Sequence, residues 1–171
     1  MRRFLDRLYG AAAWLAALAM IGTLAMILTS IAGRLLHFHV RGTDAYAGYC
    51  MAAAAFLALA HTFKRGEHIR VTLLLERFGP SVHRVLQLWS HAAGLLLAGL
   101  LAWFSLRLVL QSYTFNDISQ GNDATPLWLP QSAMALGSLV FVIALLDSFV
   151  GVLRHREPRH RAADAEPVRS E

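Results

Sequence analysis

Two histidines in the long apolar segments of this sequence are the side chains best suited to hold a cofactor. His61 lies near the end of the second apolar segment, and His91 lies in the third. Two imidazoles at a similar depth in a four-helix bundle can ligate a b-type haem, which would make the chain a membrane anchor of an oxidoreductase. The simpler interpretation is that each imidazole hydrogen-bonds to a neighbour or reaches the membrane interface.

Asp147 is the main carboxylate inside an apolar segment. An ionisable group inside a membrane span is a candidate ion ligand or proton relay, which would make the chain a small transporter or channel by itself. A paired or hydrated carboxylate is the simpler explanation, because Asp147 lies about two helical turns from the segment's end and Arg154 follows it. Arg107 has a simple explanation too, since its long side chain can reach the lipid headgroups.

Other features of the sequence argue against catalysis. No G-x-x-x-x-G-K-[ST] loop is present, so ATP hydrolysis by that route is excluded. The single cysteine, Cys50, can form neither an internal disulfide nor a cysteine metal cluster. No nucleophile, base and orienting group stand out together. We therefore predict that the chain is not an enzyme and has no cofactor or metal ion of its own.

Apolar segments must position these few polar groups. The chain has 171 residues, of which 56% are hydrophobic and 16% charged, and the charges fall in clusters between long uncharged runs. A helix of about 20 residues crosses a hydrocarbon layer of about 30 Å. The sequence predicts an all-α membrane domain over residues 1–153, with four spans at about 11–33, 45–63, 85–106 and 127–153.

Two further segments lie outside the spans. Residues 68–79 have apolar side chains on one helical face and charged ones on the other, which predicts a short amphipathic helix in the membrane interface. Residues 154–171 are charged and contain Pro and Ala, which predicts a disordered tail.

The distribution of basic residues predicts the orientation. All but three of the 16 lysines and arginines lie before the first span, between the second and third spans, or after the fourth. Basic residues favour the cytoplasmic side, so both termini are predicted to be cytoplasmic. The same rule explains the net charge of +5, and binding to nucleic acid is not predicted.

Small residues form stripes in the second and third spans. Small side chains let helices approach closely where lipid provides no hydrophobic drive for association. These positions are therefore candidates for helix packing or for a partner interface, namely Ala54, Ala58, Gly94, Ala98 and Ala102.

The connection between the third and fourth spans is polar, has turn residues, and contains no Lys or Arg. It is predicted to be a periplasmic loop. Its candidate functional residues are Asp117, Gly121, Pro126 and Trp128.

The charged stretch after the second span carries a resemblance. It reads Arg65-Gly66-Glu67-His68-Ile69-Arg70-Val71 and leads into a leucine-rich segment. This string resembles the signature of the small permease (DctQ-like) subunit of tripartite ATP-independent periplasmic (TRAP) transporters. The resemblance covers roughly residues 4–153 and includes the four spans and the loop that leads into Pro126.

The resemblance implies a division of labour. Such subunits pair in the bacterial inner membrane with a larger permease subunit, which carries the substrate and Na⁺ sites. A soluble periplasmic protein captures the substrate, commonly an organic acid. The small subunit anchors and enlarges the static scaffold in the lipid bilayer, and the motif Arg65 to Val71 would belong to the interfacial anchor.

One region departs from the family pattern. Many members begin the second span with adjacent acids and an arginine a few residues later. Here the region reads Asp44-Ala45-Tyr46-Ala47-Gly48, so only Asp44 corresponds. This departure indicates a divergent subgroup, and the substrate of other members should not be transferred to this chain.

Overall fold

The computed structural model describes residues 2–38, 40–65, 80–121 and 123–153. Within these residues the chain forms four helices, α1 (Arg2–Leu35), α2 (Thr43–Arg65), α4 (Pro80–Phe115) and α5 (Trp128–Leu153). Each is long and apolar enough to cross a membrane, which confirms the all-α fold with four candidate spans. The predicted interfacial helix (68–79) and tail (154–171) lie outside the described residues.

Helices α1, α2 and α4 run past the predicted spans, α4 most of all, whereas α5 begins one residue after its predicted start. The thickness of the hydrocarbon layer limits the apolar stretch, whereas the helix itself can continue into the polar region. Pro80 is the first residue of α4, and Pro130 lies in the first turn of α5. A proline is tolerated there because its missing N–H would have no helical partner in any case.

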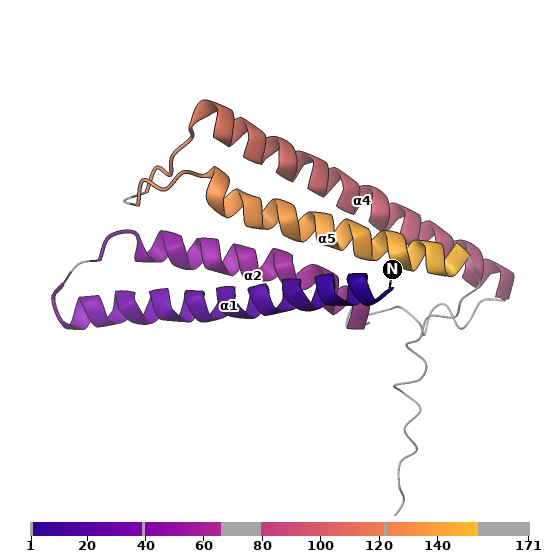
Figure 1. Ribbon diagram of the computed structural model, residues 1–171, viewed down its shortest axis with the longest axis horizontal. Helices are drawn as coiled ribbons and strands as arrows, with labels where there is room; N and C mark the ends of the chain where they lie inside the picture. Colours follow the sequence, from indigo (N-terminus) through magenta and orange to yellow (C-terminus); the bar gives the residue numbers. More distant parts are fainter. Residues whose placement is uncertain (1, 39, 66–79, 122, 154–171) are drawn as a thin grey trace, which may run out of the picture.

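The four helices lie side by side in the order α1, α2, α5, α4 (Figure 1). We call this arrangement the helix row. Its loop end is where α1 connects to α2 and α4 connects to α5, and its terminal end is where α1 begins and α5 ends. Helix α5 packs against both α2 and α4, so it joins the α1–α2 hairpin to the α4–α5 hairpin.

Helices α1 and α2 form an antiparallel pair. At its middle, a β-carbon built on Gly22 would lie 3.1 Å from the Cys50 sulfur. At the loop end, Ser30 donates a hydrogen bond of 3.3 Å to Asp44. Lys64 pairs with Asp6 at the other end. The contacts therefore follow one register along the whole pair.

Helices α2 and α5 cross closely at Gly137. A β-carbon at Gly137 would lie 2.5 Å from the backbone carbonyl carbon of Phe56. The neighbouring Ser138 is fully buried and donates its hydroxyl hydrogen to the Ala135 carbonyl oxygen at 2.9 Å. Glycine and serine at this crossing remove the bulk that would otherwise keep the two helices apart.

Helices α4 and α5 pack along the predicted stripe of the third span. His91 Nε2 lies 3.2 Å from Ser148 Oγ, and a β-carbon at Gly94 would lie 3.9 Å from Leu145. Further along α4, the same seam contains four buried small residues, namely Ala98, Ala102, Ser105 and Ser112.

The row has little interior, and what is buried is mostly small. In the most apolar stretch of α1 only 6% of residues are buried, against 22% in α5. Large apolar side chains such as Trp14, Leu97 and Trp103 point outward. This pattern suits a protein whose solvent is lipid, because helix association there depends on close packing rather than on hiding apolar surface.

Candidate functional site

Polar contacts gather at the two ends of the helix row. At the loop end, the connection between α4 and α5 contacts the first turns of α2. Tyr49 donates a hydrogen bond of 3.1 Å to one carboxylate oxygen of Asp123, and Ser119 donates one of 2.8 Å to the other. Thr125 donates to the Tyr46 hydroxyl at 3.0 Å. We call the group Gly42, Tyr46, Tyr49, Asp123 and Thr125 the loop clasp.

Gly42 allows the loop to approach this closely. Its φ angle is +79°, in the left-handed region that favours glycine. A β-carbon there would also lie 2.7 Å from the β-carbon of Asp123. The same residue precedes α2 and accepts, through its carbonyl oxygen, a hydrogen bond of 3.0 Å from the Tyr46 backbone N–H.

The Asp123 carboxylate is held in its charged form. Desolvation of the carboxyl opposes ionisation, but hydrogen bonds from Thr125, Ser119, its own backbone and Tyr49 outweigh it and hold the pKa of Asp123 below its usual value. Removing any of these donors should therefore favour protonation and loosen the loop.

Three of the four loop residues predicted from the sequence, Asp117, Gly121 and Pro126, lie in this same connection, whereas Trp128 is the first residue of α5. The backbone N–H of Leu127 donates to the Asp117 carbonyl oxygen at 3.0 Å, beside the bridge between Ile118 and Pro126. A β-carbon on Gly121 would lie 2.7 Å from an Asp123 carboxylate oxygen. These residues shape the loop.

Trp128 ties the loop to the helices. Its ring meets that of Tyr113 edge to face, with ring centres 5.8 Å apart, where α4 ends and α5 begins. Such aromatic pairs contribute about 0.5–1.5 kcal/mol beyond the area they bury.

Asp123, Tyr49 and Gly42 form contacts that the sequence analysis did not predict. The turn signal at residues 121–123 was visible. Tyr49, the partner of Asp123, lies 74 residues away in the sequence, and no local pattern predicts a pair at that separation.

At the terminal end, Lys64 links α2 to α1. It pairs with Asp6, and its ammonium nitrogen lies 4.6 Å from the centre of the Tyr9 ring. Tyr9 is only 2% exposed and packs with Ala60 and Ala144 where three helices meet. These contacts close the terminal end but leave Lys64 and Asp6 partly exposed, so their ion pair contributes little to stability.

The family-like motif begins where α2 ends. Arg65 is the last residue of α2, and residues 66–71 lie outside the described part of the chain. Asp44 lies in the first turn of α2, where a carboxylate favours the helix dipole, and it accepts the hydrogen bond from Ser30. Gly48, at the position of the missing family arginine, is exposed, and a β-carbon there would meet nothing within 4 Å.

The candidate chemical residues do not form a common site. His91 contacts Ser148 of α5, and His61 lies half-buried on α2. Asp147 is exposed on α5 and lies near enough to interact electrostatically with Tyr9. In the ranges that the structure describes, no three His, Cys, Asp or Glu side chains are grouped to hold a metal ion. This geometry gives the haem alternative no support.

The small-residue stripes pack inside the chain. Ala54, Ala98 and Ala102 are buried, and Ala58 and Gly94 are half-buried. The α4 positions lie on the seam with α5, so the structure uses them for helix packing within the subunit. The exposed side chains of the row, rather than these positions, are available to lipid or a partner.

The fold and its polar contacts together define a multi-pass membrane protein whose side-chain contacts serve mainly to hold its own helices and loop. A family model described as "Tripartite ATP-independent periplasmic transporters, DctQ component" matches residues 23–155 of the 171-residue chain. The chain therefore belongs to the DctQ family of TRAP transporter components, as its residues 65–71 and their context suggested. No curated protein matches the chain significantly.

Proposed function

We propose that this chain anchors and scaffolds the large permease subunit of a TRAP transporter. In this role it supports the Na⁺-coupled uptake of an organic anion, of the carboxylate class, without binding that anion. A periplasmic binding protein would deliver the substrate to the complex. Membership of the DctQ family supports the transporter role, and the shape of the helix row supports the scaffolding role.

The observation that carries the proposal is the helix row itself. Helices arranged side by side expose large apolar residues on α1, α2, α4 and α5 alike. A single layer of helices buries few of its own side chains but presents a wide surface to its surroundings. We place the contact with the large subunit on this exposed apolar surface, because Ala54, Ala98 and Ala102 already pack inside the chain.

The uninterrupted spans of this chain support the assignment of the substrate and Na⁺ sites to the large subunit. Na⁺ sites in secondary transporters draw on several oxygen ligands and often on unwound helices. The four helices described here are continuous. We therefore expect this subunit alone to move no substrate and to carry no enzyme activity.

Orientation follows the basic residues. We place both termini in the cytoplasm and the loop end in the periplasm, in the bacterial inner membrane. The loop clasp would then face the periplasmic binding protein, and its ordered polar loop would offer a docking surface.

The test is a mild-detergent purification of the tagged full chain from its native membranes, followed by uptake measurements with the isolated partners. We expect a colourless complex with one large polytopic protein, and uptake only when both membrane subunits and the binding protein are present. Each membrane subunit by itself provides the matched control.

Two outcomes would overturn the proposal. Uptake of the same size by the large subunit without this chain would remove the scaffolding role. A Soret band that disappears in His61→Ala or His91→Ala would instead show haem ligation by the two histidines.

A further inference from the structure

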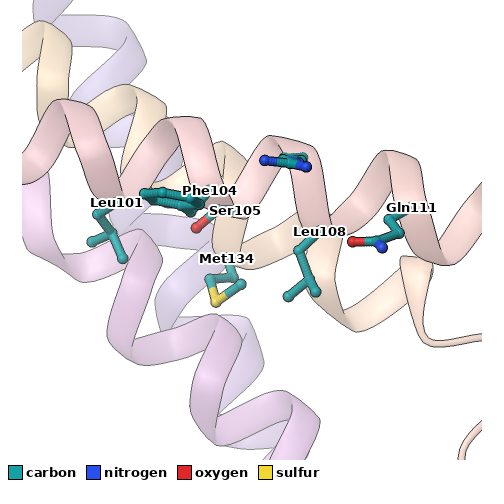
Figure 2. Close-up of a pocket in the computed structure, with 7 residues that line it drawn as sticks. Leu101, Phe104, Ser105, Leu108, Gln111 and Met134 are labelled. Atoms are coloured by element: carbon teal, nitrogen blue, oxygen red, sulfur yellow. The ribbon is translucent and has the colours of Figure 1, made fainter.

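A groove of about 440 Å³ opens along the loop-end half of α4, where Met134 of α5 forms its opposite wall (Figure 2). Its apolar lining comes from Leu101, Phe104 and Leu108 of α4 together with Met134. These side chains form a surface suited to a hydrocarbon chain rather than to a polar solute.

Three polar residues, Ser105, Arg107 and Gln111, line the same groove and can donate hydrogen bonds to a ligand. Ser105 is only 3% exposed, yet within the described part of the chain its hydroxyl has no hydrogen-bond partner. Figure 2 shows its oxygen on the side of α4 that faces Met134. Its oxygen is not fully enclosed but opens to the groove, so it can donate a hydrogen bond to an acceptor that a ligand supplies.

Arg107 and Gln111 lie one helical turn apart on the same wall. Arg107 is exposed, and no acidic side chain in the described ranges pairs with it. A guanidinium on an apolar helix surface binds phosphate well, because its planar donors match the phosphate oxygens. The polar end of the groove is therefore suited to bind an anion with several acceptor oxygens.

The groove has the depth of one leaflet. Gln111 lies near Tyr113, whose ring meets that of Trp128 edge to face at the start of α5, so the polar end lies near the membrane surface. Leu101 lies ten residues earlier in the helix, which is about 15 Å deeper at about 1.5 Å per residue. That is half of the hydrocarbon layer of about 30 Å. The groove is therefore polar at the surface and apolar toward the bilayer centre.

We propose that this groove binds one phospholipid of the leaflet at the loop end. The phosphate accepts hydrogen bonds from the Arg107 guanidinium and the Gln111 amide. The Ser105 hydroxyl donates to an ester carbonyl oxygen below it. One acyl chain then lies against Leu101 and Phe104, where Met134 closes the groove from α5.

The match of charge and depth selects this occupant over others. A free phosphate ion would satisfy Arg107 but leave the apolar half empty. A partner helix would fill the apolar half, yet it would have to bring an acid or several acceptors to the level of Arg107. The proposal depends on the position of the chain in the membrane and not on its role in transport.

The experiment places a photo-reactive benzoylphenylalanine at position 104, an aromatic side chain for an aromatic one, in the full-length chain in its native membranes. After illumination, the chain is purified and its intact mass is measured by mass spectrometry. We expect an adduct with the mass of a phospholipid. Arg107→Leu should reduce its yield about tenfold or more, because a charge-assisted contact contributes at least that factor to binding.

Matched controls separate a site from bulk lipid. Arg34→Leu removes another exposed arginine toward the same end of the row, outside this groove, and should leave the adduct unchanged. The same probe at the neighbouring Trp103, which does not line the groove, should label lipid equally with or without Arg107. Met134→Trp fills the groove from α5 and should suppress the adduct at position 104 while leaving Arg107 in place.

Two results would overturn the proposal. A protein adduct at position 104 would mean that a partner helix occupies the groove. A lipid adduct with the same yield in Arg107→Leu and Met134→Trp would mean that the probe contacts only bulk lipid. If Arg107→Leu cannot be recovered from the membrane, the comparison of Met134→Trp with the parent chain decides the matter alone.

Discussion

The backbones of α5 and α2 touch at Gly137 and Phe56. A β-carbon at Gly137 would lie 2.5 Å from the Phe56 carbonyl carbon and 2.6 Å from its oxygen. Because the obstacle is backbone, no side-chain rotation can make room. This crossing joins the two helical hairpins, so its tightness sets how the α1–α2 hairpin sits on the α4–α5 hairpin.

Gly137→Ala should destabilise the subunit by about 1–3 kcal/mol, as overpacking of a tight interior does. Thermal unfolding in detergent, followed by the loss of the monodisperse elution peak, would measure it. Gly99→Ala is the matched control, because a β-carbon there meets nothing within 4 Å. It should be neutral or stabilising by about 0.5–1 kcal/mol, as alanine is favoured over glycine in helices. Equal shifts in the two variants would contradict the tight crossing.

We expect the small residues Gly94, Ala98 and Ala102 of α4 to pack against α5 of the same chain and not against a partner subunit. Ala98→Leu puts three extra carbons into the seam with α5, where Ala98 is only 4% exposed, and should lower the stability of the isolated subunit by about 1–3 kcal/mol. Ala92→Leu makes the same change at an exposed position of α4 and should have little effect. A loss of partner binding in Ala98→Leu with no change in the melting temperature of the isolated chain would instead place the stripe at a subunit interface.

Gly42→Ala should open the loop clasp. The left-handed backbone costs a side-chain-bearing residue about 1–2 kcal/mol, and the new methyl group would meet the β-carbon of Asp123. Hydrogen exchange in residues 116–127 should then rise, while exchange in the middle of α5 should not. Gly48→Ala, within α2 and open to its surroundings, provides the comparison. Unaltered loop protection in Gly42→Ala would show that the loop does not depend on this approach.

The loop clasp should weaken in acid. The folded pKa of Asp123 lies below its unfolded value of about 3.9, so its contribution to stability is fully present above that value. It is lost as the pH falls from about 4 through the folded pKa. The advantage of the parent chain over Asp123→Asn, measured as protection of the loop from exchange, should therefore shrink below about pH 4. Asp117→Asn removes another, exposed carboxylate of the same loop and provides the comparison at each pH.

The membrane-spanning helices could be predicted because each is a local property. In lipid the backbone must satisfy its own hydrogen bonds, so an apolar run of sufficient length has to be helical whatever its neighbours are. The family could be predicted for a similar reason, since residues 65–71 form a continuous string whose order and place after the second span are visible in the sequence. The orientation predicted from the arginines depends on counts of charge in each connection and remains a prediction.

The contacts between helices could not be predicted in this way. The repeat of Gly94, Ala98 and Ala102 announced a close contact but not its partner, because small residues favour any well-fitting helix equally. Only the structure shows that the partner is α5 and that His91 meets Ser148 on the same seam. Whether His61 and His91 could face each other likewise depends on how the helices pack, and local sequence does not decide it.

The sequence by itself determined that this chain has four spans and belongs among the small subunits of TRAP transporters, because span length and a short motif are written locally. The tertiary structure decided the order of the helices, with α5 between α2 and α4, and the pairing of Asp123 with Tyr49 across 74 residues. Both depend on how complementary surfaces meet, and in lipid no general hydrophobic preference selects which helices meet. That selection comes from individual steric fits such as Gly137 on Phe56.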